Sequence, residues 1–72
     1  MPIDYSKLIG RIIEKFGTRS AFAEAMGKKL EAISRRLNNK AQWQTEEYIL
    51  ACELLDIQPE EVYAYFFTPK LR

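Results

Sequence analysis

The segment 19–38 constrains the fold most, because it reads as two short amphipathic helices joined at a single glycine, Gly27. Ala23 lies four residues before Gly27, and Ile33 and Leu37 follow one helical turn apart. A small side chain at Ala23 lets the second helix cross close to the first, and glycine readily adopts the positive φ that ends a helix. The spacing therefore predicts a helix-turn-helix over about residues 19–38, whose second helix projects outward.

Apolar residues recur with the period of a helix in every long segment, and no segment shows sustained alternation. The chain is therefore expected to be all-α, a compact bundle of about five short helices in one domain over residues 1–72. The first predicted helix runs from a cap at Asp4 or Ser6 to Gly17, and the second covers 19–26 after a cap at Thr18. The third runs from about Lys29 to Asn38. The fourth runs from Thr45 to the break at 57–59, and the fifth runs from Pro59 to Thr68.

Large aromatic side chains outside the helix-turn-helix supply much of the predicted core. Trp43, the only tryptophan, is expected to fold back onto the core, because one indole is a large share of the apolar area of so small a protein. Tyr65 and Phe66 are expected to pack inward, and part of the surface of 65–67 is left for a dimer or partner contact. Residues 70–72 are predicted to be a frayed tail.

The composition argues against an enzyme. The chain has no histidine and one cysteine, Cys52. Histidine is the commonest general base and metal ligand, and a lone cysteine cannot close an internal disulfide. We therefore expect no catalytic site, metal, cofactor or small-molecule substrate, with Cys52 as a small core residue. No apolar run or N-terminal signal predicts membrane insertion or export, so a soluble cytoplasmic protein without membrane contact is expected.

Charge is distributed unevenly, although the formal net charge is only +1. The stretch 28–40 has a net charge of +4, and residues 41–72 have a net charge of −4. Positive potential is thus concentrated on the second helix of the predicted corner and the loop after it, where a phosphate-facing surface would need it. The residues concerned are Lys28, Lys29, Arg35, Arg36 and Lys40, against Glu31 alone.

Several short phrases support a family resemblance, namely Phe16-Gly17-Thr18, Phe22–Gly27, Leu37-Asn38, the loop Lys40–Trp43, Ala51–Leu55 and Tyr65–Thr68. Together they resemble the Cro and repressor DNA-binding domains of temperate phages, in particular the small Cro-like and modulator-of-repression proteins of phages of Gram-positive hosts. The resemblance covers nearly the whole chain. It implies a lambda-repressor-like DNA-binding domain with the helix-turn-helix at the second and third helices.

The resemblance also implies which residues meet a binding partner. The exposed face of the third helix would face base edges or a partner protein through Lys29, Leu30, Glu31, Ala32 and Arg35. Residues around it would bind backbone phosphates, namely Arg19, Ser20, Lys28, Arg36, Asn38, Asn39 and Lys40. Arg35 is the residue best suited to a bidentate contact with guanine.

The third helix departs from the usual pattern of such domains at its start. Lys28 and Lys29 occupy positions where an aliphatic residue and a small hydroxyl residue are usual. The helix therefore lacks its usual cap, at a cost of about 1 kcal/mol, and two cations lie near the positive end of its dipole. Glu31 adds a carboxylate that DNA repels unless it meets a cytosine amino group.

Two functions are consistent with these features. The first is a sequence-specific, double-stranded DNA-binding transcriptional regulator of the phage Cro type, which binds an operator as a homodimer in a lysis/lysogeny-like switch. The alternative is a modulator of repression, an antirepressor that binds the DNA-binding domain of a phage repressor protein, alone or together with DNA. The missing cap, Glu31 and the acidic C-terminal half favour this alternative, in which the cationic surface would pair with acidic groups of the partner.

Overall fold

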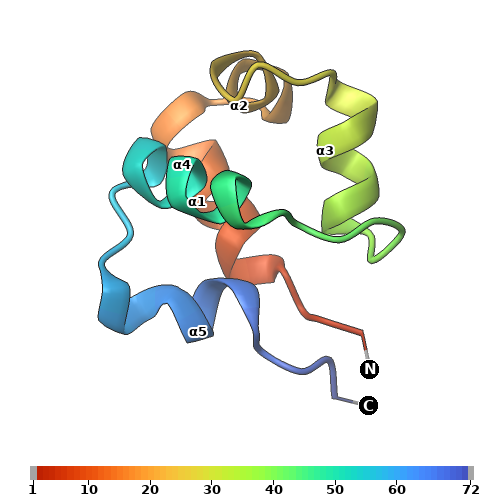
Figure 1. The fold of residues 1–72 in the computed structure, drawn as a ribbon, viewed down its shortest axis with the longest axis vertical. Coiled ribbons are helices and arrows are strands. Elements are labelled where there is room, and N and C mark those ends of the chain that lie inside the picture. The colour runs from red at the N-terminus through yellow and green to blue at the C-terminus, as the bar shows by residue number, and fades with distance from the viewer. Residues whose placement is uncertain (1, 72) are drawn as a thin grey trace.

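The computed structural model describes residues 2–71, which form short helices joined by turns (Figure 1). The helices are α1 (Ser6–Phe16), α2 (Arg19–Ala25), α3 (Leu30–Leu37), α4 (Thr45–Leu55) and α5 (Val62–Phe66), with a 3-10 turn, η1 (Pro59–Glu61), before α5. The radius of gyration is 11.2 Å, against about 11 Å for a compact chain of this length. The predicted all-α class and the compact bundle of five helices are confirmed.

Local sequence signals set most helix ends where they were predicted. Ser6 begins α1, and its N–H and hydroxyl donate to the Asp4 carboxylate at 2.9 and 2.6 Å. Gly17 ends α1 with a φ of 83°. Thr18 caps α2, because its hydroxyl accepts the N–H of Ala21 at 3.1 Å. Other helix ends lie within two residues of their predicted positions. The last helix differs more, since its first turn after Pro59 is a 3-10 turn rather than α-helix.

One apolar core joins all five helices. Its largest fully buried side chains are Phe22, Phe66, Leu8, Ile12, Ile33 and Leu55. Trp43 folds back onto this core as predicted, and its ring meets Phe66 edge-on with centroids 5.4 Å apart. Tyr65 and Phe66 are buried, whereas Phe67 keeps 41% of its surface exposed. Cys52 is only half-buried, on the edge of the core rather than within it.

The two ends of the chain meet at one edge of the molecule (Figure 1). Asp4 N–H donates to the Thr68 carbonyl at 2.8 Å, and Lys70 N–H donates to the Pro2 carbonyl at 3.0 Å. The prediction of a frayed tail was therefore wrong for Lys70, because its backbone is paired with the N-terminal segment. Leu71 is exposed, and Arg72 lies outside the described residues.

None of the helices within residues 2–71 combines the length and the apolar run needed to span a bilayer.

Candidate functional site

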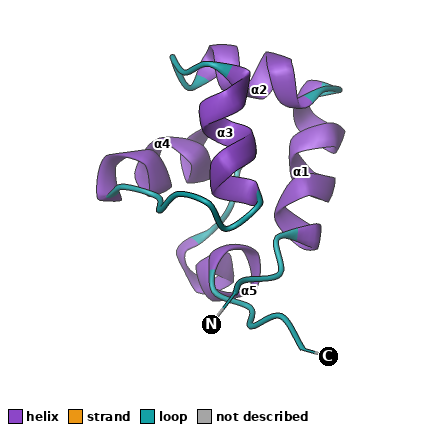
Figure 2. Ribbon diagram, turned by 90° about the vertical axis from the view of Figure 1, so that its right-hand side faces the viewer, coloured by secondary structure: helices purple, strands orange, loops and turns teal. Residues whose placement is uncertain are grey.

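The turn between α2 and α3 has the geometry that its glycine predicted. Gly27 has a φ of 72°, and the next N–H, that of Lys28, donates to the Ala23 carbonyl at 2.9 Å. Ala23 is 1% exposed, which leaves no room for a larger side chain where the two helices pack. This turn changes the direction of the chain, and α3 lies at the front of the molecule in Figure 2.

One face of α3 packs into the core and the other faces solvent. Ile33 and Leu37 are buried, whereas Lys29, Glu31 and Arg35 are exposed. The outward projection predicted for this helix is therefore observed. Within the part of the chain that the structure describes, no side chain caps the N-terminus of α3 at Lys29, as the sequence indicated. A shallow depression of about 400 Å³ brings together six of the predicted contact residues, Lys28, Lys29, Glu31, Ala32, Arg35 and Arg36, beside Gly27.

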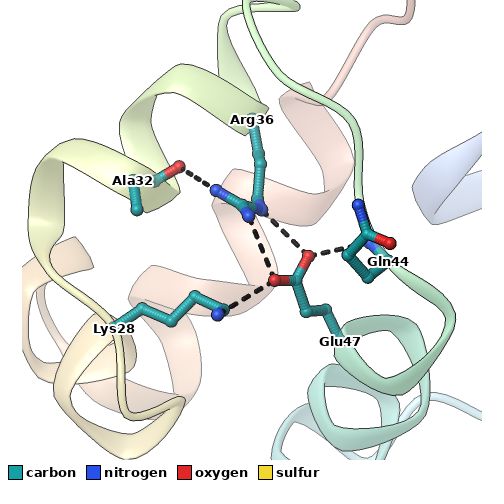
Figure 3. A network of polar contacts seen from close by, with 5 residues as sticks. All are labelled: Lys28, Ala32, Arg36, Gln44 and Glu47. Carbon is teal, nitrogen blue, oxygen red and sulfur yellow. Dashed lines mark hydrogen bonds and ion pairs between the residues drawn. The ribbon is translucent and has the colours of Figure 1, made fainter.

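A buried carboxylate on α4 organises the inner edge of this surface (Figure 3). Glu47 is 7% exposed. Its two oxygens accept from the Nε and Nη2 atoms of Arg36 at 2.9 and 3.0 Å, and Lys28 Nζ lies 3.1 Å away. The N–H of Gln44 donates to the same carboxylate at 2.8 Å. Arg36 also donates through Nη1 to the Ala32 carbonyl at 2.8 Å. We call these five residues the Glu47 network.

The network keeps Glu47 charged. Burial alone would raise the pKa of Glu47, but hydrogen bonds from Arg36, from the N–H of Gln44 and from Lys28 outweigh burial and lower this pKa from 4.5 to about 2. One buried negative charge therefore faces two cations at neutral pH. A phosphate contact by Lys28 or Arg36 would have to compete with Glu47 for the same N–H groups.

Sequence reasoning assigned Lys28 and Arg36 to phosphate binding and did not anticipate Glu47 as their partner. It placed Glu47 in the first turn of its helix, where the dipole favours a carboxylate. The spacing Gln44-x-x-Glu47 was the available signal, because it is the spacing at which a glutamate reaches back to the N–H of the cap residue.

The other predicted phosphate contacts lie at the two ends of the corner. Arg19 and Ser20 are exposed at the start of α2, and Asn38 and Lys40 are exposed after α3. The Asn39 side chain is already used, since its Oδ1 accepts from the N–H of Ile3 at 2.8 Å and its Nδ2 donates to the Ile3 carbonyl at 3.0 Å. Asn39 thus holds the N-terminal segment against the end of α3.

The chain belongs to the family described as "Protein of unknown function (DUF739)", whose model matches residues 1–69. Its fold is also that of a known phage regulator. The solution structure of the modulator of repression (MOR) of the temperate bacteriophage TP901-1 from Lactococcus lactis is 40% identical in sequence, with a TM-score of 0.82 over 100% of this chain and 97% of that chain. No curated protein matches this chain in sequence. The resemblance to small phage proteins that modulate repression is confirmed.

Proposed function

We propose that this protein is a modulator of repression, which acts by binding the DNA-binding domain of a phage repressor in the cytoplasm of a bacterial host. The observation that carries the proposal is the 40% identity to a phage modulator of repression over the whole chain. Of the two functions expected from the sequence, this similarity supports the alternative better than the Cro-type regulator. Binding occurs with the repressor alone or with the repressor on DNA.

The electrostatics of α3 favour a protein partner. Glu47 offsets part of the positive charge of Lys28 and Arg36, which removes potential that a DNA-binding surface would need. On the exposed face, Lys29 and Arg35 accompany the carboxylate of Glu31. Mixed charge suits a protein surface better than a phosphate backbone.

The apolar centre of the exposed α3 face also favours a protein partner. Leu30 is 42% exposed there, and Ala32 is half-buried beside it. An exposed apolar residue ringed by charge is the usual composition of a protein–protein contact. We assign this face, made of Lys29, Leu30, Glu31, Ala32 and Arg35, to contacts with the repressor or with DNA in a joint complex.

The Cro-type function is the second candidate, in which the α2–α3 corner would act as the helix-turn-helix of a lambda-repressor-like homodimer. The position of Arg35 favours it. Among residues 2–71 no carboxylate lies within ion-pair distance of Arg35, and its guanidinium contacts only the Lys40 carbonyl, at 3.3 Å. Arg35 is thus free to reach a guanine edge. Arg19, Ser20 and Lys40 are exposed at the two ends of the α2–α3 corner, where they would suit contacts with the DNA phosphate backbone.

Gel mobility of promoter DNA from the encoding locus separates the two functions. The DNA is mixed with this protein alone, with the repressor of that locus alone, and with both. A modulator leaves the DNA unshifted by itself and either releases or supershifts the repressor complex. A specific shift by this protein alone at physiological salt, competed only by operator sequence, would contradict the modulator and establish the Cro-type function.

A further inference from the structure

A groove lies where α4 leads into η1, on the left of Figure 1, whereas α3 lies on the right. Its volume is about 440 Å³. The half-buried side chains of Cys52 and Val62 line it and pack against the core. Ile49, which is 58% exposed, forms one edge, and Glu53 and Asp56 stand beside it. The groove is thus an apolar surface with carboxylates at its border.

The charge around this groove has one sign. Residues 45–66 contain six acidic residues and no lysine or arginine. Glu47 is used by the network with Lys28 and Arg36. The other five form no ion pair with any residue of the described chain, namely Glu46, Glu53, Asp56, Glu60 and Glu61. The charges of Glu53 and Asp56, which line the groove, are therefore available to an external cation.

We propose that this acidic groove binds the DNA-recognition helix of the repressor, an inference that rests on the proposed function. A recognition helix is cationic because it works against phosphates. Its lysines and arginines would pair with Glu53 and Asp56, while an apolar side chain of the helix would cover Ile49, Cys52 and Val62. The repressor could then not use those cations on DNA, which explains how binding would lift repression.

The charges of the two surfaces favour the acidic groove over the α3 face as the binding site of the recognition helix. The stretch 28–40 has a net charge of +4, of which Glu47 offsets only one unit. The α3 face therefore keeps the sign of a recognition helix, and like charges brought together oppose binding. A second copy of this chain fits the groove less well than the repressor. Its own α3 holds Glu31 at the centre, and its Arg36 is already paired with Glu47.

The test measures affinity for the purified DNA-binding domain of the repressor from the encoding locus, by titration calorimetry. One groove variant removes charge at nearly constant shape, Glu53→Gln with Asp56→Asn. Asparagine is chosen because residue 56 has a φ of 55°, which asparagine tolerates. The other groove variant is Ile49→Ser. Each should weaken binding about tenfold.

Two controls carry single changes of the same kinds at exposed positions outside the groove. Glu24→Gln removes an exposed carboxylate from α2, and Ile13→Ser removes an exposed isoleucine, 45% exposed, from α1. Both should bind the repressor domain within about twofold of the parent protein. Circular dichroism of all four variants checks that they fold.

Cys52 provides a second readout without any mutation, because it is the only cysteine and lines the groove. Saturating repressor domain should slow its alkylation by iodoacetamide at least about fivefold, since the thiol is then covered. Alkylation of the folded protein without the partner gives the reference rate.

The outcomes separate this inference from the proposed function. Weak binding by the groove variants only, with protection of Cys52, supports the acidic groove. Normal binding by all variants and unchanged alkylation would overturn the groove and leave the modulator function in place. No binding of the repressor domain to the parent protein would overturn both. Loss of self-association in Ile49→Ser, measured by sedimentation, with repressor binding intact, would assign the groove to a second copy instead.

Discussion

Arg36 on α3 and Glu47 on α4 form a two-point ion pair, with N–O distances of 2.9 and 3.0 Å across a buried contact. The two helices are separated in sequence by the loop 38–44, so this pair fixes how α3 lies against the bundle. Removing one partner of such a pair leaves a buried charge without compensation, which costs more than the intact pair contributes. Arg36 therefore stabilises the packing of α3 on α4, although it belongs to the helix that faces outward.

Acid should expose the contribution of Glu47 to stability. Because its folded pKa of about 2 is below the ordinary 4.5, the charged carboxylate stabilises the fold above pH 4.5, and this contribution is lost as pH falls toward 2. The free energy of unfolding of the parent protein should drop by up to about 3 kcal/mol across that window. Glu47→Gln should be less stable at neutral pH and lose less on acidification.

Urea denaturation followed by circular dichroism at several pH values measures these differences. Glu46→Gln, a change at the exposed neighbouring position, is the control and should follow the parent protein. An unchanged acid dependence in Glu47→Gln would show that other carboxylates govern it.

Adjacent arginines of α3 should differ in their effects on stability. Among residues 2–71, Arg36→Ala leaves the Glu47 carboxylate with Lys28 as its only ion-pair partner and should cost about 3 kcal/mol. Arg35→Ala, at an exposed position, should change stability by less than about 0.5 kcal/mol. Thermal and urea unfolding of both variants checks this contrast, and equal costs would refute the division of roles. Because Arg35→Ala keeps the fold, its effect on repressor or operator binding reports on the surface alone.

Alanine should have opposite effects at two glycines. Gly27 has a φ of 72°, where a Cβ is strained even though, within residues 2–71, nothing beyond its chain neighbours lies within 4 Å of the Cβ position. Gly27→Ala should therefore cost about 1 kcal/mol. Gly10 lies inside α1 with equal space, so Gly10→Ala should stabilise by up to about 1 kcal/mol. Chemical denaturation of the two variants provides the comparison. A gain in stability from Gly27→Ala would mean that the turn does not need the left-handed conformation.

The hydroxyl of Tyr65 should contribute to the stability of the fold, whereas that of Tyr63 should not. Tyr65 Oη accepts from Arg11 Nε and Nη2 at 3.2 and 2.9 Å and lies on a ring that is 5% exposed. Tyr65→Phe keeps the packing and loses this bond, for a cost of about 1 kcal/mol. Tyr63 is 64% exposed, and Tyr63→Phe should unfold at the same urea concentration as the parent protein. Indistinguishable midpoints for the two variants would indicate that the Arg11 contact is energetically neutral.

Much of the fold was predictable because its signals are local. The period of the apolar residues gave the all-α class, Thr18 marked the start of α2, and Gly27 marked the turn before α3. Caps and positive φ values depend on residues within one helical turn, so they can be read before any tertiary contact is known. The burial of Trp43 also followed from its size in a short chain.

The contacts of the predicted site residues were less predictable. Lys28, Arg36 and Asn39 look like phosphate ligands in sequence, yet the first two bind Glu47 and the third binds the backbone of Ile3. The same holds at the end of the chain, where Lys70 pairs with Pro2. In each case the partner is distant in sequence, so its identity depends on how the helices pack.

By itself, the sequence determined that this chain forms short helices, that one of them turns outward after Gly27, and that its charge divides into a basic and an acidic stretch. Only the tertiary structure decided which charged side chains remain available to bind a partner. Packing α3 against α4 buries Glu47 beside Lys28 and Arg36, whereas Arg35, Glu53 and Asp56 stay at the surface. The physical reason is that a buried carboxylate needs compensating cations, and those nearest in space bind it whatever role their positions in the sequence suggest.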